Sequence, residues 1–139
     1  MADGKVEFEL VSPERLLLSE PVDMVVVPGS EGDFGVLPRH APLISTVRPG
    51  VIAVHDGGQV TARIFVAGGF AEVTPERCTV LADEAVSLDQ ADREATQTRL
   101  SNAQDDLRYA ENDEERSAAE AEIAIAEALL AAIDSHSST

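Results

Sequence analysis

The sequence is poor in the residues that usually build binding sites and cross-links. Among its 139 residues there is no Trp, one Tyr and one cysteine, Cys78, and aromatic residues make up only 4%. A lone cysteine excludes an intrachain disulfide, and its apolar neighbours indicate a small core residue. No apolar run approaches the roughly 20 residues that span a bilayer. Because aromatic residues are so few, the core is expected to consist of Val, Leu, Ile and Ala.

Positive charge is also scarce. Ten Lys and Arg residues stand against 26 Asp and Glu, which gives a net charge of −16. Nucleic acids and anionic lipids both require a basic surface, so neither is expected as a direct partner. The first five residues lack the apolar segment of a signal peptide, which favours a cytosolic protein. If the protein works at a membrane, other proteins must hold it there.

The residues that carry chemistry do not form a recognisable site. The three His residues are His40, His55 and His136, and their spacing matches no metal-ligand pattern. No Gly-x-Ser-x-Gly sequence and no phosphate-binding Gly-rich loop is present. Asp33 and His40 are the one pair that could serve in acid–base chemistry, and we do not expect that role. The sequence therefore predicts no catalytic site, no cofactor and no metal.

The first 87 residues alternate short apolar segments with turn signals. Apolar and acidic residues alternate over residues 6–11, which predicts a strand with one buried face. A hairpin is expected around residues 55–59, where two glycines adjoin. Eight to ten strands in an antiparallel β-sandwich are expected over residues 1–87. The other strand candidates are residues 16–18, 22–27, 51–54, 60–66, 70–73 and 78–82.

The pattern changes near Ser87. Residues 88–139 contain no Gly and no Pro, and their apolar residues recur at helical spacing. Asp89 is a candidate N-cap, with Asp92 three residues further on, and Asp113 is a candidate cap for a second helix. The sequence predicts a second domain over residues 88–139, an antiparallel two-helix hairpin whose last residues, 135–139, are frayed.

Residues 29–45 form the segment around which the first domain is organised. Its glycines and prolines predict a tight turn, a short strand and a stiff loop that presents polar tips. The expected tips are Asp33, Arg39 and His40, which would form a contact surface. The expected loop anchors are Gly32, Phe34, Gly35, Val36, Leu37, Pro38, Pro42 and Leu43, and Ile44 also favours burial. The alternative is that the segment is only a structural corner of the sheet.

This segment resembles the signature loop of the epsilon subunit of rotary F-type ATP synthases, called delta in mitochondria. The matching runs are Gly-Asp-Phe-Gly at 32–35 and His-Ala-Pro-Leu at 40–43. Two further matches are Val-Ala-Gly-Gly-Phe-Ala-Glu-Val at 66–73 and Thr-Val-Leu-Ala-Asp at 79–83. The order and spacing fit the family, and the similarity covers essentially the whole chain.

The resemblance implies a non-catalytic rotor subunit of the central stalk. Its sandwich would pack on the gamma subunit and touch the c-subunit ring, with Asp33, Arg39 and His40 at that contact. The hairpin could reach the alpha and beta subunits, and the complex would sit at the cytoplasmic face of a bacterial inner membrane. Proton flow through such a complex is coupled to ATP synthesis. A ligand-binding β-sandwich module with a helical interaction tail is the alternative.

Two properties of many bacterial relatives are not expected here. Relatives bind ATP through a Leu/Ile-Asp-x-x-Arg-Ala motif, whereas this chain has Asp92 in the Arg position and Arg93 in the Ala position. In relatives that inhibit hydrolysis, basic residues on the second helix meet acidic partner loops. Residues 88–139 carry four Arg against thirteen Asp or Glu, a net charge of −9. The inhibitory role of the hairpin is therefore predicted to be weak or absent.

Overall fold

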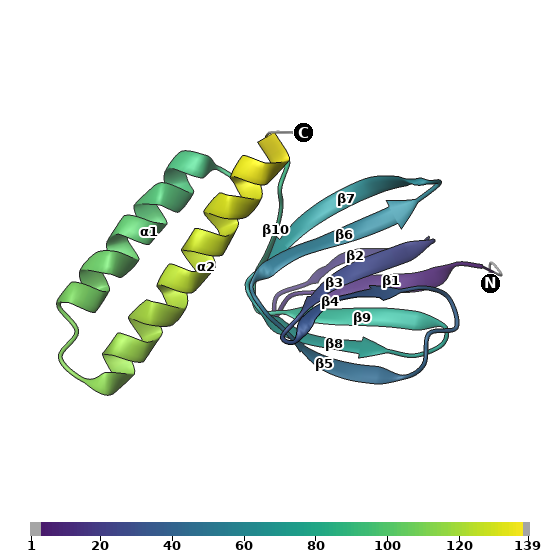
Figure 1. The fold of residues 1–139 in the computed structure, drawn as a ribbon, viewed down its shortest axis with the longest axis horizontal. Coiled ribbons are helices and arrows are strands. Elements are labelled where there is room, and N and C mark those ends of the chain that lie inside the picture. The colour runs from purple at the N-terminus through teal and green to yellow at the C-terminus, as the bar shows by residue number, and fades with distance from the viewer. Residues whose placement is uncertain (1–3, 138–139) are drawn as a thin grey trace. The chain divides into compact units, whose positions relative to one another are not determined.

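The computed structural model describes residues 4–137, and the chain divides into two compact units (Figure 1). The first unit ends at Asp89 and the second begins at Gln90. Over residues 4–137 the first unit contains ten strands and the second contains two helices. The predicted β domain followed by a two-helix hairpin is confirmed. Within this same range, neither helix is long and apolar enough to cross a membrane.

The ten strands form one continuous, curled sheet in the described part of the chain. Their order across the sheet is β10-β7-β6-β3-β5-β8-β9-β1-β2, and β4 pairs with β3 beside this path. The strands are β1 (Val6–Val11), β2 (Leu16–Val22), β3 (Met24–Gly29), β4 (Gly32–Val36), β5 (Leu43–Val47), β6 (Gly50–Asp56), β7 (Gln59–Val66), β8 (Gly69–Val73), β9 (Arg77–Ala82) and β10 (Ala85–Ser87).

Most neighbouring strands are antiparallel and are joined by short turns. The expected hairpin is formed by β6 and β7 around Gly57 and Gly58, which both have positive φ angles, 63° and 80°. That conformation is accessible to glycine at little cost. The pair of β1 and β9 is parallel, with Phe8 beside Cys78. This long-range pairing inserts the first strand between β9 and β2 and departs from the purely antiparallel sandwich expected from the sequence.

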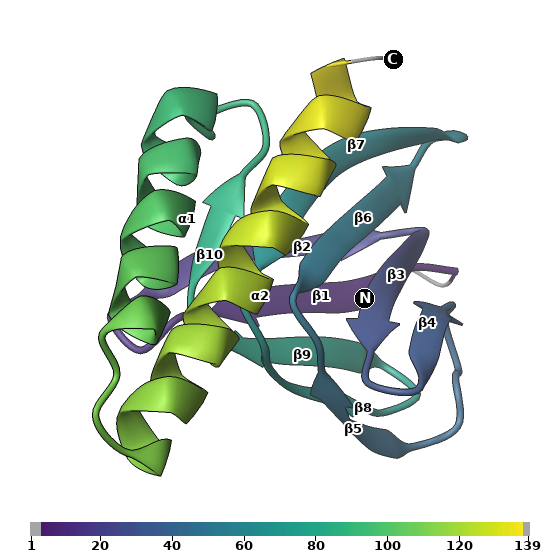
Figure 2. The same ribbon diagram turned by 60° about the vertical axis from the view of Figure 1, so that its left-hand side comes forward.

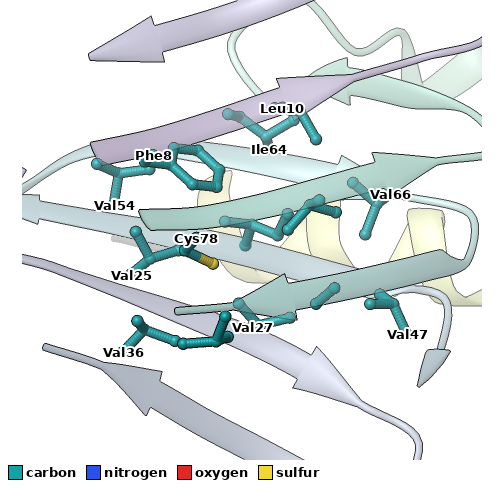
Figure 3. Packing of buried hydrophobic residues seen from close by; sticks show 14 of the residues in the cluster. Phe8, Leu10, Val25, Val27, Val36, Val47, Val54, Ile64, Val66 and Cys78 are labelled. Atoms are coloured by element: carbon teal, nitrogen blue, oxygen red, sulfur yellow. The ribbon is translucent and has the colours of Figure 1, made fainter. Parts of the chain in front are cut away.

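The core lies inside the curled sheet and consists of aliphatic side chains with few aromatic rings. Val6, Phe8 and Leu10 of β1 are 0–1% exposed, as their alternation with acidic residues predicts. They pack with valines of β3, β6 and β7 (Figure 3). Cys78 is also fully buried, which confirms it as a small core residue. Burial raises the pKa of its thiol to about 12, so the group stays protonated near neutral pH.

The second unit consists of α1 (Arg93–Arg108) and α2 (Asp113–Ser137), which pack side by side (Figures 1 and 2). Neither helix contains Gly or Pro, and alanine is the strongest helix former. Ala103 of α1 and Ala119 and Ala126 of α2 are buried. Small side chains at these positions allow the two helix axes to approach each other.

The helix caps differ from the expected ones. Asp92, not Asp89, caps α1, since its carboxylate accepts a hydrogen bond from the Ala95 N–H. The reason is that β10 continues the sheet to Ser87 and the Leu88 N–H donates to the Arg63 carbonyl, which delays the helix. At α2 the Asn112 side chain accepts from the Glu115 N–H, so Asn112 rather than Asp113 is the capping residue.

The end of α2 also differs from the prediction. The helix continues to Ser137, so the expected fraying of residues 135–137 is wrong, while residues 138–139 lie outside the described residues. Two ion pairs connect the two helices, one near this end and one in the middle of α2. Arg93 Nε donates to Asp134 Oδ1 at 2.8 Å, and Arg99 pairs with Glu122. The Arg93 hydrogen bond lowers the pKa of Asp134.

Candidate docking site

Residues 29–34 form a tight hairpin around Phe34. Gly29 ends β3 and pairs with Gly32, which begins β4. A Cβ atom at Gly29 would come within 2.8 Å of the Gly32 carbonyl oxygen and 2.9 Å of the Phe34 ring. Only glycine therefore lets the ring lie over the backbone at this point. Phe34 is half-buried and packs against the core, whereas its neighbours Gly32 and Gly35 are exposed.

The structure gives Asp33 a partner within the chain. Arg48 Nη2 lies 2.6 Å from Asp33 Oδ1, and Arg48 Nη1 donates to the Gly29 carbonyl at 2.6 Å. The Arg48 N–H also donates to the Pro28 carbonyl. Arg48 therefore holds both the carboxylate and the backbone of the β3–β4 turn. Sequence reasoning missed Arg48, because only the pairing of Gly29 with Val47 brings it there.

Arg39 and His40 lie in a second tight turn, beyond the other end of β4. The His40 N–H donates to the Leu37 carbonyl at 3.2 Å, Pro38 follows Leu37, and Arg39 has φ of 68°. A proline followed by a residue with positive φ is the pattern of a type II turn. The Arg39 N–H donates to the Pro75 carbonyl at 2.8 Å, which attaches the turn to the β8–β9 connection.

The three expected tips do not form one cluster. Asp33 lies near the start of β4 and Arg39 and His40 lie beyond its end, and six residues of extended chain span up to about 20 Å. His40 Nδ1 lies 2.7 Å from the Ala41 carbonyl oxygen, so its ring is oriented by the neighbouring backbone. Asp33 and the pair of Arg39 and His40 are therefore two separate polar sites on the same segment.

Burial is wrongly predicted for several apolar residues of the segment. Val36 is buried as expected, but Leu37 and Leu43 are exposed and Ile44 is 73% exposed. Leu37 starts the type II turn beyond the end of β4, so the sheet does not cover it. Ile44 points to the outer face of β5 because Val47 and Ser45 take the inner face. Pro38 is partly buried and Pro42 is exposed.

An apolar row crosses the outer face of four strands near Ile44. The strand register places Phe70 beside Leu81, Leu81 beside Val11, and Val11 beside Leu16. Phe70, Leu81 and Leu16 are 57%, 54% and 55% exposed. We call Phe70, Leu81, Val11 and Leu16 the outer apolar row. A contiguous exposed apolar surface of this kind is typical of a protein–protein contact.

The described residues do not form a metal-binding cluster. Within residues 4–137, no three His, Cys, Asp or Glu side chains converge in a way that could hold a metal ion. His55 lies at the end of β6 and His136 in the last turn of α2. The first unit presents two stiff turns, at β3–β4 and at residues 37–40, and the outer apolar row. These are features of a docking surface.

Comparison with known proteins identifies the family. A family model described as "ATP synthase, Delta/Epsilon chain, beta-sandwich domain" matches residues 5–88. The ATP synthase epsilon chain of Rhodospirillum rubrum is 66% identical over 91% of this chain and 94% of its own length. The chain belongs to the ATP synthase epsilon chain family. As an epsilon chain it is a non-catalytic subunit, which confirms that it is not itself an enzyme.

Further relatives extend the similarity over both units. The epsilon chain of Paramagnetospirillum magneticum is 54% identical over 93% of this chain and 97% of its own. Among solved structures, a chain of the Euglena gracilis mitochondrial ATP synthase is 26% identical, covers 96% of this chain and 84% of its own length, and has a TM-score of 0.80. A chain from the Tetrahymena thermophila enzyme, at 14% identity and a TM-score of 0.69, shares the fold.

Asp92 and Arg93, the two residues that depart from the nucleotide motif, both have structural roles in the hairpin. Asp92 is the N-cap of α1, with its carboxylate turned to the Ala95 N–H. Arg93 is engaged by Asp134 through Nε and Nη2, at 2.8 and 3.4 Å. Hydrogen bonding to Asp134 raises the pKa of Arg93, so the pair stays charged at neutral pH. Both residues that replace the motif thus have structural partners within the hairpin.

Proposed function

We propose that the chain is a central-stalk subunit of a proton-translocating ATP synthase and couples rotation of the c-subunit ring to ATP synthesis. Its sandwich docks on the gamma subunit and the ring and turns with them. Family membership supports this, as does the fold shared with a chain in a Tetrahymena structure described as "central stalk/cring". The complex holds the subunit at the cytoplasmic face of the bacterial inner membrane.

The outer apolar row is the observation that carries this proposal. Three of its side chains are more than half exposed, and Ile44 on β5 extends the surface. Covering the remaining exposed area of each side chain contributes about 1 kcal/mol, at roughly 25 cal/mol per Å². Such a surface gives a docking partner apolar area to bury, and we assign it to the gamma subunit. The two polar turns then remain available to the ring.

Co-purification tests the proposal. The wild-type chain should purify with a membrane-bound ATPase and leave when that complex is stripped. Replacing both Phe70 and Leu81 by Ser should release the subunit at lower salt or detergent concentration without unfolding the domain, because both side chains are exposed. Tyr109→Ser is a matched control, since Tyr109 is 71% exposed on the hairpin rather than on the row. Equal retention of the double variant and the wild type would contradict the assigned surface.

We also propose that the hairpin inhibits ATP hydrolysis weakly or not at all. All four of its arginines pair with carboxylates of the hairpin itself. The pairs are Arg93–Asp134, Arg99–Glu122, Arg108–Asp105 and Arg116–Asp113. Contact with acidic loops of the alpha or beta subunits would therefore set like charges against each other, which is unfavourable.

The same residues support an absence of ATP binding. Asp92 caps α1 and would repel phosphate, and Arg93 is held by Asp134. Calorimetric titration with Mg-ATP should reveal no site with a Kd below about 1 mM, or about 4 kcal/mol of binding free energy. Tight binding would show that the pair of Arg93 and Asp134 opens to receive the nucleotide.

A further inference from the structure

The turn between β6 and β7 contains a peptide bond of a type that rearranges spontaneously. The sequence has two Asp-Gly pairs, Asp3-Gly4 and Asp56-Gly57, and the second pair begins this turn. In an Asp-Gly pair the glycine nitrogen can attack the aspartate side chain, because glycine has no Cβ atom to obstruct the approach. A Cβ atom added at Gly57 would meet no atom within 4 Å. Crowding by neighbouring atoms therefore does not protect this pair.

The rearrangement converts aspartate to isoaspartate in two steps. The Gly57 nitrogen forms a bond to Asp56 Cγ and loses its proton, while the carboxyl group loses its hydroxyl, so that one water molecule leaves. Water then opens the five-membered imide at either carbonyl group. One product is the original aspartate, and the other carries the main chain through Cγ and is one methylene longer. That extra length would disturb the pairing of Asp56 with Gln59 in the hairpin.

Both reacting groups of Asp56-Gly57 are held by other side chains. The Gly57 N–H donates to Asp23 Oδ2 at 2.8 Å, and Lys5 Nζ pairs with the Asp56 carboxylate. Lys5 Nζ also lies 2.9 Å from Asp23 Oδ1, so one ammonium group joins the two carboxylates. The Asp23 N–H donates to the His55 carbonyl at 3.0 Å, which fixes Asp23 beside the turn. We call Lys5 and Asp23 the Lys5–Asp23 clamp.

We propose that Asp56-Gly57 is a latent isoaspartate site and that the Lys5–Asp23 clamp protects it. Attack requires the Gly57 nitrogen to turn toward the Asp56 side chain, so its hydrogen bond to Asp23 must break first. The ion pair with Lys5 restrains the Asp56 carboxylate in the same way. Hydrogen bonds that involve charged groups are stronger than neutral ones, and breaking them raises the barrier to reaction. This inference goes beyond the proposed docking function and does not rest on it.

The clamp persists near neutral pH and depends on the folded sheet. Hydrogen bonding to Asp56 and Asp23 raises the pKa of Lys5, which therefore stays a cation. Hydrogen bonds from Lys5 and from the Gly57 N–H lower the pKa of Asp23, which stays an anion. Lys5 precedes β1, Asp23 lies between β2 and β3, and Asp56 ends β6. Only folding brings these residues together, so the unfolded chain should lack the protection.

Ageing of the purified full-length chain tests the proposal. Isoaspartate at residue 56 is measured by methyltransferase labelling and tandem mass spectrometry after incubation at neutral pH. Asp23→Ala should form it about tenfold faster than the wild type, because the hydrogen bond from Gly57 to a charged acceptor is lost. Lys5→Gln should accelerate it about two- to fourfold, since a partly exposed ion pair contributes less.

Two control variants separate loss of the clamp from other effects. Glu72→Ala removes an exposed carboxylate of β8 in the same unit and should age like the wild type. Phe34→Ala lowers the stability of the fold without touching the clamp. At a temperature where circular dichroism shows every variant to be folded, Phe34→Ala should also age like the wild type at residue 56.

The other Asp-Gly pair of the sequence serves as an internal standard. Asp3-Gly4 should isomerise at the same rate in the wild type, in Asp23→Ala and in Glu72→Ala. When the wild-type chain is unfolded in urea, Asp56-Gly57 should react at a rate similar to that of Asp3-Gly4, because glycine follows aspartate in both pairs. In the folded wild type Asp56-Gly57 should be the slower pair.

The outcomes decide the inference independently of the docking function, which co-purification tests. Faster isoaspartate formation at residue 56 in both clamp variants, with residue 3 and Phe34→Ala unchanged, supports it. Unchanged rates in Asp23→Ala and Lys5→Gln would overturn it. A slower rate in Asp23→Ala would also overturn it, because Asp23 would then act as a base that promotes the attack. Equal acceleration in Phe34→Ala would assign the protection to the fold in general and not to the clamp.

Discussion

At the scale of single residues, the segment of residues 29–45 contains some side chains that stabilise the fold and others that are available for recognition. Phe34 covers Gly29 and packs against the core, while His40 lies in a turn and bonds to its neighbour's backbone. Phe34→Ala should therefore lower the free energy of unfolding by about 2 kcal/mol, less than for a fully buried ring. His40→Ala should change it by no more than about 0.5 kcal/mol. Denaturant unfolding of both variants measures the difference, and equal losses would show that Phe34 is not the anchor.

Gly69 provides a second test at this scale. It has φ of 139°, and a Cβ atom there would collide with the Leu81 carbonyl oxygen. Gly58 also has positive φ, at 80°, but a Cβ atom there meets open space. Both alanine variants incur the cost of a positive φ, and only Gly69→Ala adds a steric collision. Gly69→Ala should lose about 2 kcal/mol more stability than Gly58→Ala in denaturant unfolding. Similar losses would mean that the β8–β9 pair relaxes freely.

At the scale of elements, two surface ion pairs add to the buried contacts between the helices of the hairpin. Hydrogen bonding to Arg93 lowers the pKa of Asp134 below its ordinary value of 3.8. A lowered folded-state pKa adds stability above the unfolded-state value, and this contribution is lost as the pH falls through the folded-state value. The wild type should therefore be more stable than Asp134→Asn at pH 6 to 7, and the difference should shrink as the pH falls below about 4 and disappear below the folded-state pKa.

Circular dichroism melts across this pH range measure the effect. Glu127→Gln is a matched control, because Glu127 is an exposed acid on the same helix for which the described structure shows no ion pair. Its melting temperature should stay close to the wild-type value at each pH. The Asp134→Asn difference should also shrink at 1 M salt, since both partners are exposed. A difference that is as large at pH 3 as at pH 7 would show that charge pairing is not its source.

At the scale of the whole molecule, the two units should have separable roles. If the sandwich docks and the hairpin does not inhibit, removing residues 90–139 should leave the sandwich able to join the complex. ATP hydrolysis by the reconstituted enzyme should then change by less than about twofold, because every arginine of the hairpin is already paired within it. A several-fold rise, larger at low salt, would identify the hairpin as an inhibitor.

Local patterns in the sequence determined most of the fold. Alternating side chains set the buried face of β1, adjacent glycines set the β6–β7 turn, and the loss of Gly and Pro after Ser87 marked the helices. These features depend on residues close together in the chain, so backbone preferences suffice to read them. The family motifs had the same local character and led to the correct family.

Only the tertiary structure decided which distant residues meet. The parallel β1–β9 pair joins Val11 to Leu81, and with it the outer apolar row forms from residues that are up to 70 positions apart in the sequence. The Asp33–Arg48 pair needs the β3–β5 register, and the shift of the α1 cap to Asp92 needs β10 on β7. Each depends on strand pairing across the sheet, which local preferences do not encode.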